Sequence, residues 1–298
     1  MRVLGITRIL SDEFFVRLQY RCWHGGNLNL DNPQDYNEKI QWQKLNYRNE
    51  MMRVCADKFL VRDFVSERIG EQYLVPLLAV FEKVEDLDLE KLPSSFVLKA
   101  TRASSWNIVC VDKKKLEMDK LRKRIRKWFC KDFFEYGREW QYKGGVRRVI
   151  CEDYIPGIAD GKGLMEYKFY TFRGITKYIW VDFSKEDEAG IVTNFRNIYD
   201  AAWNFQQDKS VTLPNNPMEI QNKPVRLEDM KNMAYKLARE FPQCRVDFYA
   251  SQDGRVFFGE MTFTSQGGCG IFRPDSFGKE LGGYVDFQEK KAERYESN

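Results

Sequence analysis

Residues 245–262 read RVDFYASQDGRVFFGEMT, two short strand-like runs separated by the turn signal Ser251-Gln252-Asp253-Gly254. This layout predicts a hairpin that places Asp247 and Glu260 side by side on one face of a sheet. Two carboxylates held this way can share a hard divalent cation such as Mg²⁺, which prefers oxygen ligands and often binds phosphates as well. The alternative interpretation is a polar hairpin whose two acids are simply hydrated.

Two upstream runs favour the first interpretation. Residues 96–100 read FVLKA, which places Lys99 near the end of a buried apolar strand, where its charge needs a partner. The run at 149–155 reads as another strand, and Pro156-Gly157 then takes the chain out of the sheet. The end of such a strand exposes backbone groups that can bond a ligand.

The order of these segments resembles the ATP-grasp superfamily. The resemblance rests on Asp57-Lys58, the runs around Lys99 and Glu152, and the Arg-x-Asp and Gly-Glu-x-Thr segments of the hairpin. Further segments are similar to the TupA-like branch of that superfamily, which is associated with teichuronic acid and other surface polysaccharides: YNEKIQW at 36–42, EWQYK at 139–143, YKFY at 167–170 and GEMTFT at 259–264. The similarity extends from about residue 10 to about residue 281, and together the segments are specific.

The resemblance implies roles for these residues. Lys99 would contact the phosphates of ATP, and Asp247 and Glu260 would hold Mg²⁺. Thr262 stands where many ATP-grasp enzymes have an Asn as a further metal ligand, and its neutral hydroxyl is a weaker donor. A hinge segment would hydrogen-bond the adenine through backbone groups, and it comprises Glu152, Asp153, Tyr154 and Ile155.

Three cations are candidates for catalysis. The alternation of residues 167–170 turns Lys168 toward the same cleft as the acids, as a second phosphate ligand. Arg196 begins the segment RNIYD, which is similar to a segment of the TupA-like branch, and Arg245 lies two residues before Asp247 on the same strand face. Either arginine could clamp a carboxylate or stabilise charge on a transferred phosphoryl group. The competing interpretation is a structural ion pair with a neighbouring carboxylate.

The loop after Lys99 departs from the family pattern. It reads TRASSWN at 101–107, whereas relatives usually have a glycine-rich stretch whose backbone approaches phosphate closely. Ser104 and Ser105 could still supply amides and hydroxyls, and Arg102 could supply charge instead. Trp106 is predicted to pack under the loop rather than to cap the pocket. The altered loop makes an inactive or retuned enzyme the alternative.

Composition agrees with an enzyme of this size. The chain has 298 residues, of which 43% are hydrophobic and 15% aromatic, enough to bury a sizeable core in two or three subdomains. Its 48 basic and 44 acidic residues leave a net charge of only +4, so a general nucleic-acid surface is not indicated.

The chain shows no sign of secretion or of a metal site built on Cys or His. Its seven dispersed cysteines lack a Cys-x-x-Cys spacing, which indicates neither a disulfide framework nor a zinc site. The single histidine, His24, excludes His-pair metal sites. No signal-peptide core and no apolar run near the roughly 18 residues of a membrane span is present, so a cytoplasmic protein is predicted.

Positive charge is concentrated around a helix predicted within residues 113–135. Leu121, Ile125 and Trp128 share one face of this helix, so the opposite face is cationic. A solvated surface is the favoured interpretation. The alternative is attraction to an acidic glycan or peripheral contact with the anionic membrane surface.

The predicted class is α+β, an ATP-grasp fold with the nucleotide held between two antiparallel-rich sheets. Three parts are expected: a helical N-terminal section (1–92), a small nucleotide-covering subdomain (93–148) and a larger core with the metal site (149–298). Helices are predicted at 11–22, 36–48, 51–69 and 227–241, with Asn37 as the N-cap of the second. Strands beyond the small subdomain are predicted at 149–155, 166–173, 176–183, 244–250 and 255–262.

The leading functional prediction is an ATP- and Mg²⁺-dependent carboxylate–amine ligase. ATP-grasp ligases phosphorylate a carboxylate, and an amine then attacks the acyl phosphate, so catalysis is mostly positioning and charge neutralisation. The expected acceptor is a carboxylate-bearing glycan or small molecule, above all a hexuronic acid of a surface polysaccharide or its precursor. The amine donor would be an amino acid or amino sugar.

Two other functions remain open. A glycan or small-molecule kinase needs the same nucleotide site but no second nucleophile, and a non-catalytic nucleotide-binding scaffold of polysaccharide assembly would explain the missing glycines. A glycosyltransferase ranks below the kinase, because the chain has no separate nucleotide-sugar signature.

Overall fold

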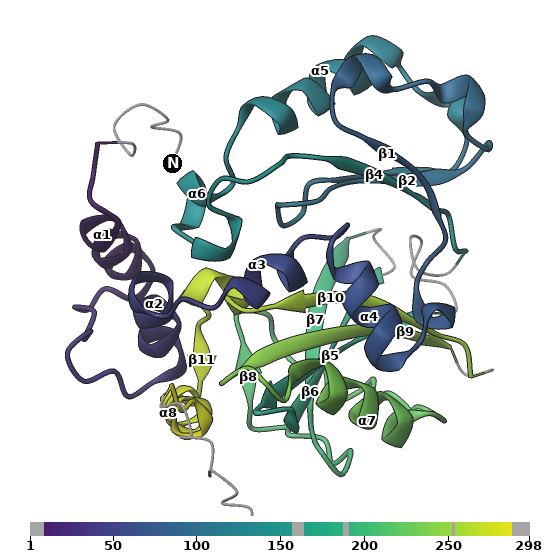
Figure 1. The fold of residues 1–298 in the computed structure, drawn as a ribbon. Helices are drawn as coiled ribbons and strands as arrows, with labels where there is room; N and C mark the ends of the chain where they lie inside the picture. The colour runs from purple at the N-terminus through teal and green to yellow at the C-terminus, as the bar shows by residue number, and fades with distance from the viewer. Residues whose placement is uncertain (1–8, 157–163, 187–190, 252–253, 288–298) are drawn as a thin grey trace, which may run out of the picture.

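The computed structural model describes residues 9–156, 164–186, 191–251 and 254–287. Two antiparallel sheets lie one above the other, each with a helix on its outer face (Figure 1). The first sheet has the order β1-β4-β2-β3, and the second has the order β10-β9-β5-β6-β7. The predicted α+β class with two antiparallel sheets is therefore confirmed.

The strands of the first sheet are β1 (Leu77–Phe81), β2 (Phe96–Ala100), β3 (Asn107–Cys110) and β4 (Val149–Asp153). Those of the second are β5 (Leu164–Phe172), β6 (Ile175–Glu186), β7 (Val192–Asp200), β9 (Cys244–Ser251) and β10 (Val256–Thr262). A small two-stranded ribbon pairs β8 (Ser210–Val211) with β11 (Phe272–Arg273).

The α-helices are α1 (Asp12–His24), α2 (Tyr36–Asn46), α3 (Glu50–Ala56), α4 (Val61–Ile69), α5 (Met118–Cys130), α6 (Phe134–Gly137), α7 (Leu227–Ala238) and α8 (Asp275–Tyr284). Short 3-10 turns are η2 (Glu71–Tyr73), η3 (Val84–Asp86), η4 (Leu89–Lys91), η5 (Lys113–Lys115), η6 (Trp140–Tyr142) and η7 (Ser265–Gly268). Within the described ranges, no helix combines the length and the apolar composition needed to cross a membrane.

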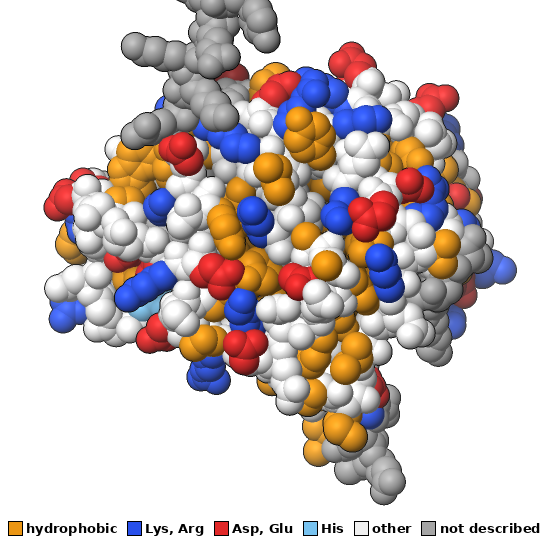
Figure 2. Space-filling model, turned by 90° about the horizontal axis from the view of Figure 1, so that it is seen from below, with side chains coloured by type: hydrophobic (Ala, Val, Ile, Leu, Met, Phe, Trp, Pro, Cys, Tyr) orange, Lys and Arg blue, Asp and Glu red, His pale blue; other side chains and the backbone are white. Residues whose placement is uncertain are grey.

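Alternation along β2 gives the first sheet its two faces. Phe96 and Leu98 pack in one cluster with Leu121 and Ile125 of α5. Because successive side chains point to opposite faces of a strand, Lys99 faces the second sheet. The cations of α5, which include Arg122, Lys123, Arg126 and Lys127, are exposed on its outer side. The opposite side of the molecule, seen from below in Figure 2, shows acidic and basic side chains interspersed.

The second sheet is apolar on its lower face and charged on its upper face. Phe169, Val246 and Phe248 belong to a buried cluster with Met230 and Leu237 of α7, which lies beneath the sheet in Figure 1. The alternate positions of the same strands therefore face the first sheet. The packing of α7 thus fixes which side chains enter the space between the sheets.

The N-terminal helices differ from the prediction at two points. The helix predicted at 51–69 is two helices, because the Asp57 carboxylate accepts the backbone N–H groups of Phe59 (2.9 Å) and Leu60 (3.2 Å) and turns the chain before α4. The N-cap of α2 is Asp35, which forms a capping box with Glu38. Asn37 is instead a buried residue within α2.

The predicted part boundaries do not follow the sheets. β1 precedes the boundary at residue 92 and β4 follows the boundary at residue 148, yet the two strands pair antiparallel in the first sheet. Pairing between strands that lie so far apart in sequence has no local signal, because strand patterns show faces rather than partners.

Candidate functional site

Charged side chains gather on the upper face of the second sheet. The antiparallel register places Lys168 opposite Asp247, and Asp247 opposite Glu260. Asp182 lies opposite Arg196 on the neighbouring pair of strands. Directly opposed residues share a face, so the predicted placement of Asp247 beside Glu260 is confirmed. Lys168 also lies on the face predicted for it.

Arg245 links the two acids of the hairpin. Its Nε donates to Asp247 Oδ1 at 2.7 Å, and its Nη2 donates to Asp247 Oδ2 at 2.6 Å. The same Nη2 donates to Glu260 Oε1 at 2.7 Å, and the Thr262 hydroxyl donates to that oxygen at 2.8 Å. In this structure Arg245 therefore forms the ion pair that was the competing interpretation of its role.

Burial and Arg245 set the pKa values of the two acids in opposite directions. Burial raises the pKa of Asp247, which is 0% exposed, to about 7, although Arg245 and Lys168 oppose the shift. At Glu260 burial also acts upward, but Arg245, Lys58 and the Thr262 hydroxyl lower its pKa to about 2. Glu260 is thus the more firmly ionised of the pair.

The hairpin fits a divalent cation as part of a larger ligand set. Asp247, Glu260 and Thr262 offer hard oxygen atoms, which suit Mg²⁺. Arg245 already bonds both oxygens of Asp247, so these residues would need oxygens from another molecule to complete the coordination. No cluster of three or more His, Cys, Asp or Glu side chains arranged for a metal occurs in the described part of the chain.

Lys168 and Arg196 converge on Asp182. Arg196 binds this carboxylate with two hydrogen bonds, Nε to Oδ1 at 2.6 Å and Nη2 to Oδ2 at 2.7 Å. Lys168 Nζ lies 3.4 Å from Asp182 Oδ2 and also pairs with Glu166. Burial would lower the pKa of Lys168, but Glu166, Asp247 and Asp182 together raise it. Lys168 is therefore a buried, fully charged cation beside the hairpin acids.

A cavity lies between the two sheets beside this charged face. Its polar lining includes Lys99, Glu152 and Glu260. The apolar lining comprises Cys55, Ala56, Val61, Leu74, Val75 and Phe258. Apolar walls with a few convergent charges are typical of small-molecule sites.

Glu152 anchors the cations at the top of this cavity. Lys99 Nζ donates to its Oε2 at 2.6 Å, and Arg62 Nη1 donates to its Oε1 at 3.0 Å. Arg62 belongs to α4, so these bonds connect the first sheet with the helix beside the second. Asp153, Tyr154 and Ile155, the other residues of the predicted hinge, are not among the residues that line the cavity.

Lys58 is the site residue that the sequence reading missed. It lines the cavity, and its Nζ donates to the carbonyl of Ala103 at 2.5 Å. Burial lowers its pKa, while Glu260 acts in the other direction. The Asp57-Lys58 pair, which carries part of the family resemblance, was the available signal, but the prediction placed it inside one helix and assigned Lys58 no role at the site. The break at Asp57 is what turns Lys58 into the cavity.

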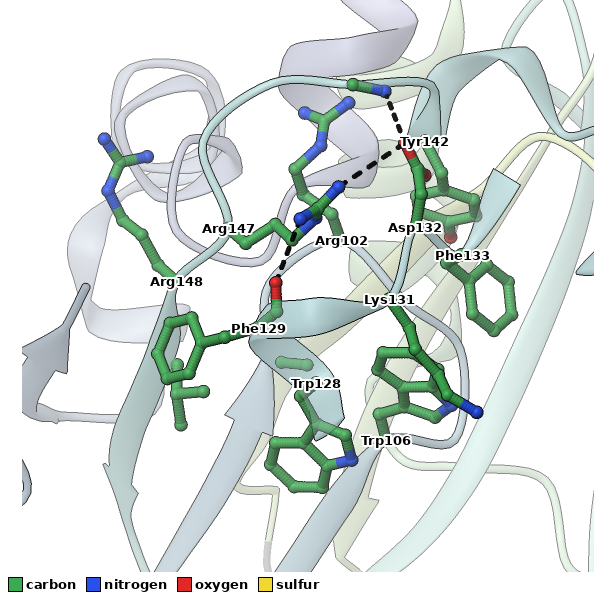
Figure 3. A pocket seen from close by; sticks show the side chains of 13 residues that line it. Arg102, Trp106, Trp128, Phe129, Lys131, Asp132, Phe133, Tyr142, Arg147 and Arg148 are labelled. Carbon is green, nitrogen blue, oxygen red and sulfur yellow. Dashed lines mark hydrogen bonds and ion pairs between the residues drawn. The ribbon is translucent and has the colours of Figure 1, made fainter. Parts of the chain in front are cut away.

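The loop after Lys99 places Arg102 away from this cavity, contrary to the predicted phosphate contact. Arg102 Nη2 donates to the carbonyl of Gln141 at 2.8 Å, and its Nη1 lies 3.7 Å from Asp57 Oδ2. The side chain lines a second pocket among aromatic rings (Figure 3). Ser104 and Ser105 are exposed at the tip of the loop. A buried acid and a free carbonyl outcompete solvent for the guanidinium.

Trp106 packs against the hydrophobic cluster between the first sheet and α5, in agreement with the predicted packing role. Its ring stacks near that of Trp128, with centroids 6.4 Å apart, and meets Phe133 edge-on at 5.6 Å. Figure 3 shows Arg147 spanning the same pocket, bonded to Asp132 and to the carbonyl of Phe129. These contacts hold the loop by packing and ion pairs.

Helix α2 holds the turn that follows β10. Gln41 Nε2 donates to the carbonyls of Gly267 (3.1 Å) and Gly268 (2.9 Å), and Lys44 Nζ donates to that of Gly267 at 2.5 Å. Asn37 bonds both backbone groups of Gly270. The turn contains Gln266 at φ 52°, Gly267 at 62° and Gly268 at 69°, a left-handed path that these clamps stabilise.

Comparison with known proteins places the chain in a family. The family model described as TupA-like ATPgrasp matches residues 38–286. No curated protein matches the chain.

Three solved structures give weaker likenesses. D-alanine–D-alanine ligase from Bacillus anthracis is 19% identical over 72% of this chain and 59% of its own, with a TM-score of 0.42. N5-carboxyaminoimidazole synthetase from Staphylococcus aureus, complexed with ADP, is 11% identical over 70% and 44%, with a TM-score of 0.37. Biotin carboxylase from Campylobacter jejuni is 12% identical over 79% and 46%, with a TM-score of 0.41. The chain therefore spans less than two thirds of each of these proteins.

Proposed function

Because the chain belongs to the TupA-like ATP-grasp family, we propose that it is an ATP- and Mg²⁺-dependent ligase that joins a carboxylate to an amine. One observation carries the proposal. Glu260 lines the cavity between the sheets and also accepts a hydrogen bond from Arg245, which binds Asp247 opposite Lys168. In this proposal the nucleotide pocket and the charge-stabilising site therefore share one carboxylate.

The cavity suits the nucleotide. Its apolar walls, which include Val61, Leu74 and Val75, suit the faces of an adenine ring. The predicted hinge after Glu152 would supply the backbone groups that bond the adenine edge. Lys99 and Lys58 would bind the phosphates, since among the described residues Lys99 pairs with one acid, Glu152, and Lys58 donates to the neutral carbonyl of Ala103. Binding ATP would replace these protein contacts with phosphate oxygens.

The metal would sit at the hairpin. Asp247 and Glu260, with Thr262 as a weaker donor, would hold Mg²⁺ together with the phosphates, and the ion would neutralise phosphoryl charge. Arg245 would then turn from Asp247 toward the transferred group. Arg196 and Lys168 would orient the acceptor carboxylate, which requires them to exchange Asp182 for the substrate.

The acceptor in this proposal is a hexuronic acid of a surface polysaccharide or its precursor. The family's association with such glycans motivates the choice, and the cations beside Asp182 provide the carboxylate recognition. The amine donor is an amino acid or amino sugar, and the reaction yields an amide, ADP and phosphate.

The test is a product analysis with the purified protein, ATP, Mg²⁺ and a panel of uronic acids, amino acids and amino sugars. The proposal expects ADP, free phosphate and a new amide mass that depend on both organic substrates. A phosphorylated acceptor without free phosphate would assign a kinase instead. ATP binding without turnover on any pair of acid and amine would contradict the ligase proposal and favour the scaffold.

Replacing Lys58 by Met is expected to weaken ATP binding by about tenfold or more, because a charge-assisted hydrogen bond contributes about 1.5–3 kcal/mol. Calorimetric titration with ATP measures the change. Lys114, an exposed lysine at the start of the basic region, is the matched control as Lys114→Met. Equal affinity in wild type and the Lys58 variant would remove Lys58 from the phosphate site.

A further inference from the structure

One carboxylate of the site has no role in the proposed function. Thr264 lies two residues beyond Thr262, along the line of the strand that bears Glu260. Its hydroxyl donates a hydrogen bond to Glu139 Oε2 and accepts one from Gln141 Nε2 at 2.8 Å. Glu139 opens the EWQYK segment, outside both sheets, and these bonds bring it to the end of β10. The charged face therefore continues past the hairpin to Glu139.

Glu139 differs from the other acids of the site in its partners. Asp247, Asp182 and Glu152 are each paired with an arginine. Glu139 has neutral hydrogen-bond donors, Thr264 and Gln141, and no Lys or Arg of the described residues lies within ion-pair distance of it. Its carboxylate is thus uncommitted to any cation.

The groups around Glu139 shift its pKa in both directions. Burial raises its pKa and Glu260 of β10 adds to the rise, while Lys44 of α2 and the Thr264 hydroxyl lower it. Lys44 itself donates to Gln41 and to the carbonyl of Gly267, so it stabilises the neighbouring turn rather than a salt bridge with Glu139. The balance favours a carboxylate that takes up a proton more readily than a free glutamate.

Amide formation requires a base. An amine donor arrives as an ammonium ion near neutral pH, and an ammonium has no lone pair for attack. The other acids nearby are paired with arginines, paired with Lys168 as Glu166 is, or reserved for the metal. Glu139 is partly exposed, close enough to Glu260 for their charges to interact, and free of a cation.

We propose that Glu139 is the general base that deprotonates the amine donor, an inference that rests on the ligase function proposed above. The ammonium gives one proton to the Glu139 carboxylate, and the nitrogen lone pair forms the C–N bond to the acyl phosphate. The C–O bond to phosphate breaks, and the leaving phosphate takes the second N–H proton. Glu139 then returns its proton to solvent, so the net products are amide, ADP, hydrogen phosphate and H⁺.

Glu139→Gln separates this step from the rest of the reaction. Gln can keep the Thr264 hydrogen bond but cannot accept a proton at neutral pH. Hydroxylamine is largely uncharged at neutral pH and needs no base, so it reports phosphorylation of the acceptor as a hydroxamate. The variant is expected to form amide about 10²-fold more slowly at pH 7 and to form hydroxamate at the wild-type rate.

The pH profile gives a second readout. Raising the pH supplies free amine without a base, so the deficit of the variant should shrink as the pH approaches the pKa of the amine. Glu117→Gln, at an exposed glutamate before α5, is the matched control. Amide and hydroxamate rates that fall together, or an amide rate that does not fall, would overturn the role of Glu139. A wild-type protein that forms neither product with any acid of the panel overturns the ligase proposal, and this inference with it.

Discussion

Glu260→Gln is expected to lower ATP-dependent turnover by about 10²- to 10³-fold, the largest catalytic effect of any single substitution at this site. Arg245 and Thr262 both donate to Glu260 Oε1, so within the described chain its Oε2 is the hairpin oxygen best placed for a metal ion. A neutral amide binds Mg²⁺ less well and also releases Arg245 from its second acid. Both effects weaken charge neutralisation at the transferred phosphoryl group.

Turnover is measured as ADP release with the substrates that the wild-type protein accepts, over a range of Mg²⁺ concentrations. The variant should require more Mg²⁺ for half-maximal rate and should retain a folded thermal transition. Glu240→Gln, at a partly exposed residue paired with Arg68, serves as the control. A rate within threefold of wild type at every Mg²⁺ concentration would exclude Glu260 from the metal site.

Arg245→Leu is expected to lower the free energy of unfolding by about 3–5 kcal/mol at pH 8, because it removes one partner of a buried ion pair. Asp247 is 0% exposed, and both of its oxygens accept hydrogen bonds from Arg245. Without the arginine the carboxylate is left with Lys168, whose charge it shares with Glu166 and Asp182. The measurement is urea unfolding of both proteins without ATP.

The loss should depend on pH in a defined direction. The pKa of Asp247 is already raised to about 7 by burial, and removal of Arg245, which lowers it, raises it further. Below this pKa the carboxyl is protonated and its burial costs less, so the difference between the proteins shrinks as the pH falls from 8 to 5. The double variant Arg245→Leu with Asp247→Asn should recover most of the loss at pH 8. A loss of unfolding free energy that does not change with pH, or a double variant as unstable as Arg245→Leu, would show that the unpaired charge of Asp247 is not the cause.

The sequence predicted four of the five strands of the second sheet and missed β7. It also predicted the pairing of the last two strands, because alternation and the turn between 249 and 256 are local signals. It placed Lys168, Asp247 and Glu260 on one face for the same reason. The long-range pairing of β1 with β4 left no such signal. The ion pairs of Arg245 could not be predicted either, because an arginine two residues from an acid can bind either a substrate or that acid.

The two placements that failed have a common cause. The sequence-based prediction put Lys58 inside a helix and Arg102 over the phosphates. In the structure Asp57 ends the helix before Lys58, and Asp57 also forms an ion pair with Arg102. A single buried aspartate thus decides both positions. Its effect depends on tertiary contacts with Arg102 and on backbone N–H groups that only the folded turn presents.

Helix α2 bonds the turn after β10, so different segments of the chain form the two sides of the site. Residues that would grip the nucleotide come from α3, α4 and the first sheet, while the floor on the far side of Glu260 is shaped by a helix that precedes them all. In the proposed function, substitutions in α2 would therefore reshape this floor without altering any residue that lines the nucleotide cavity.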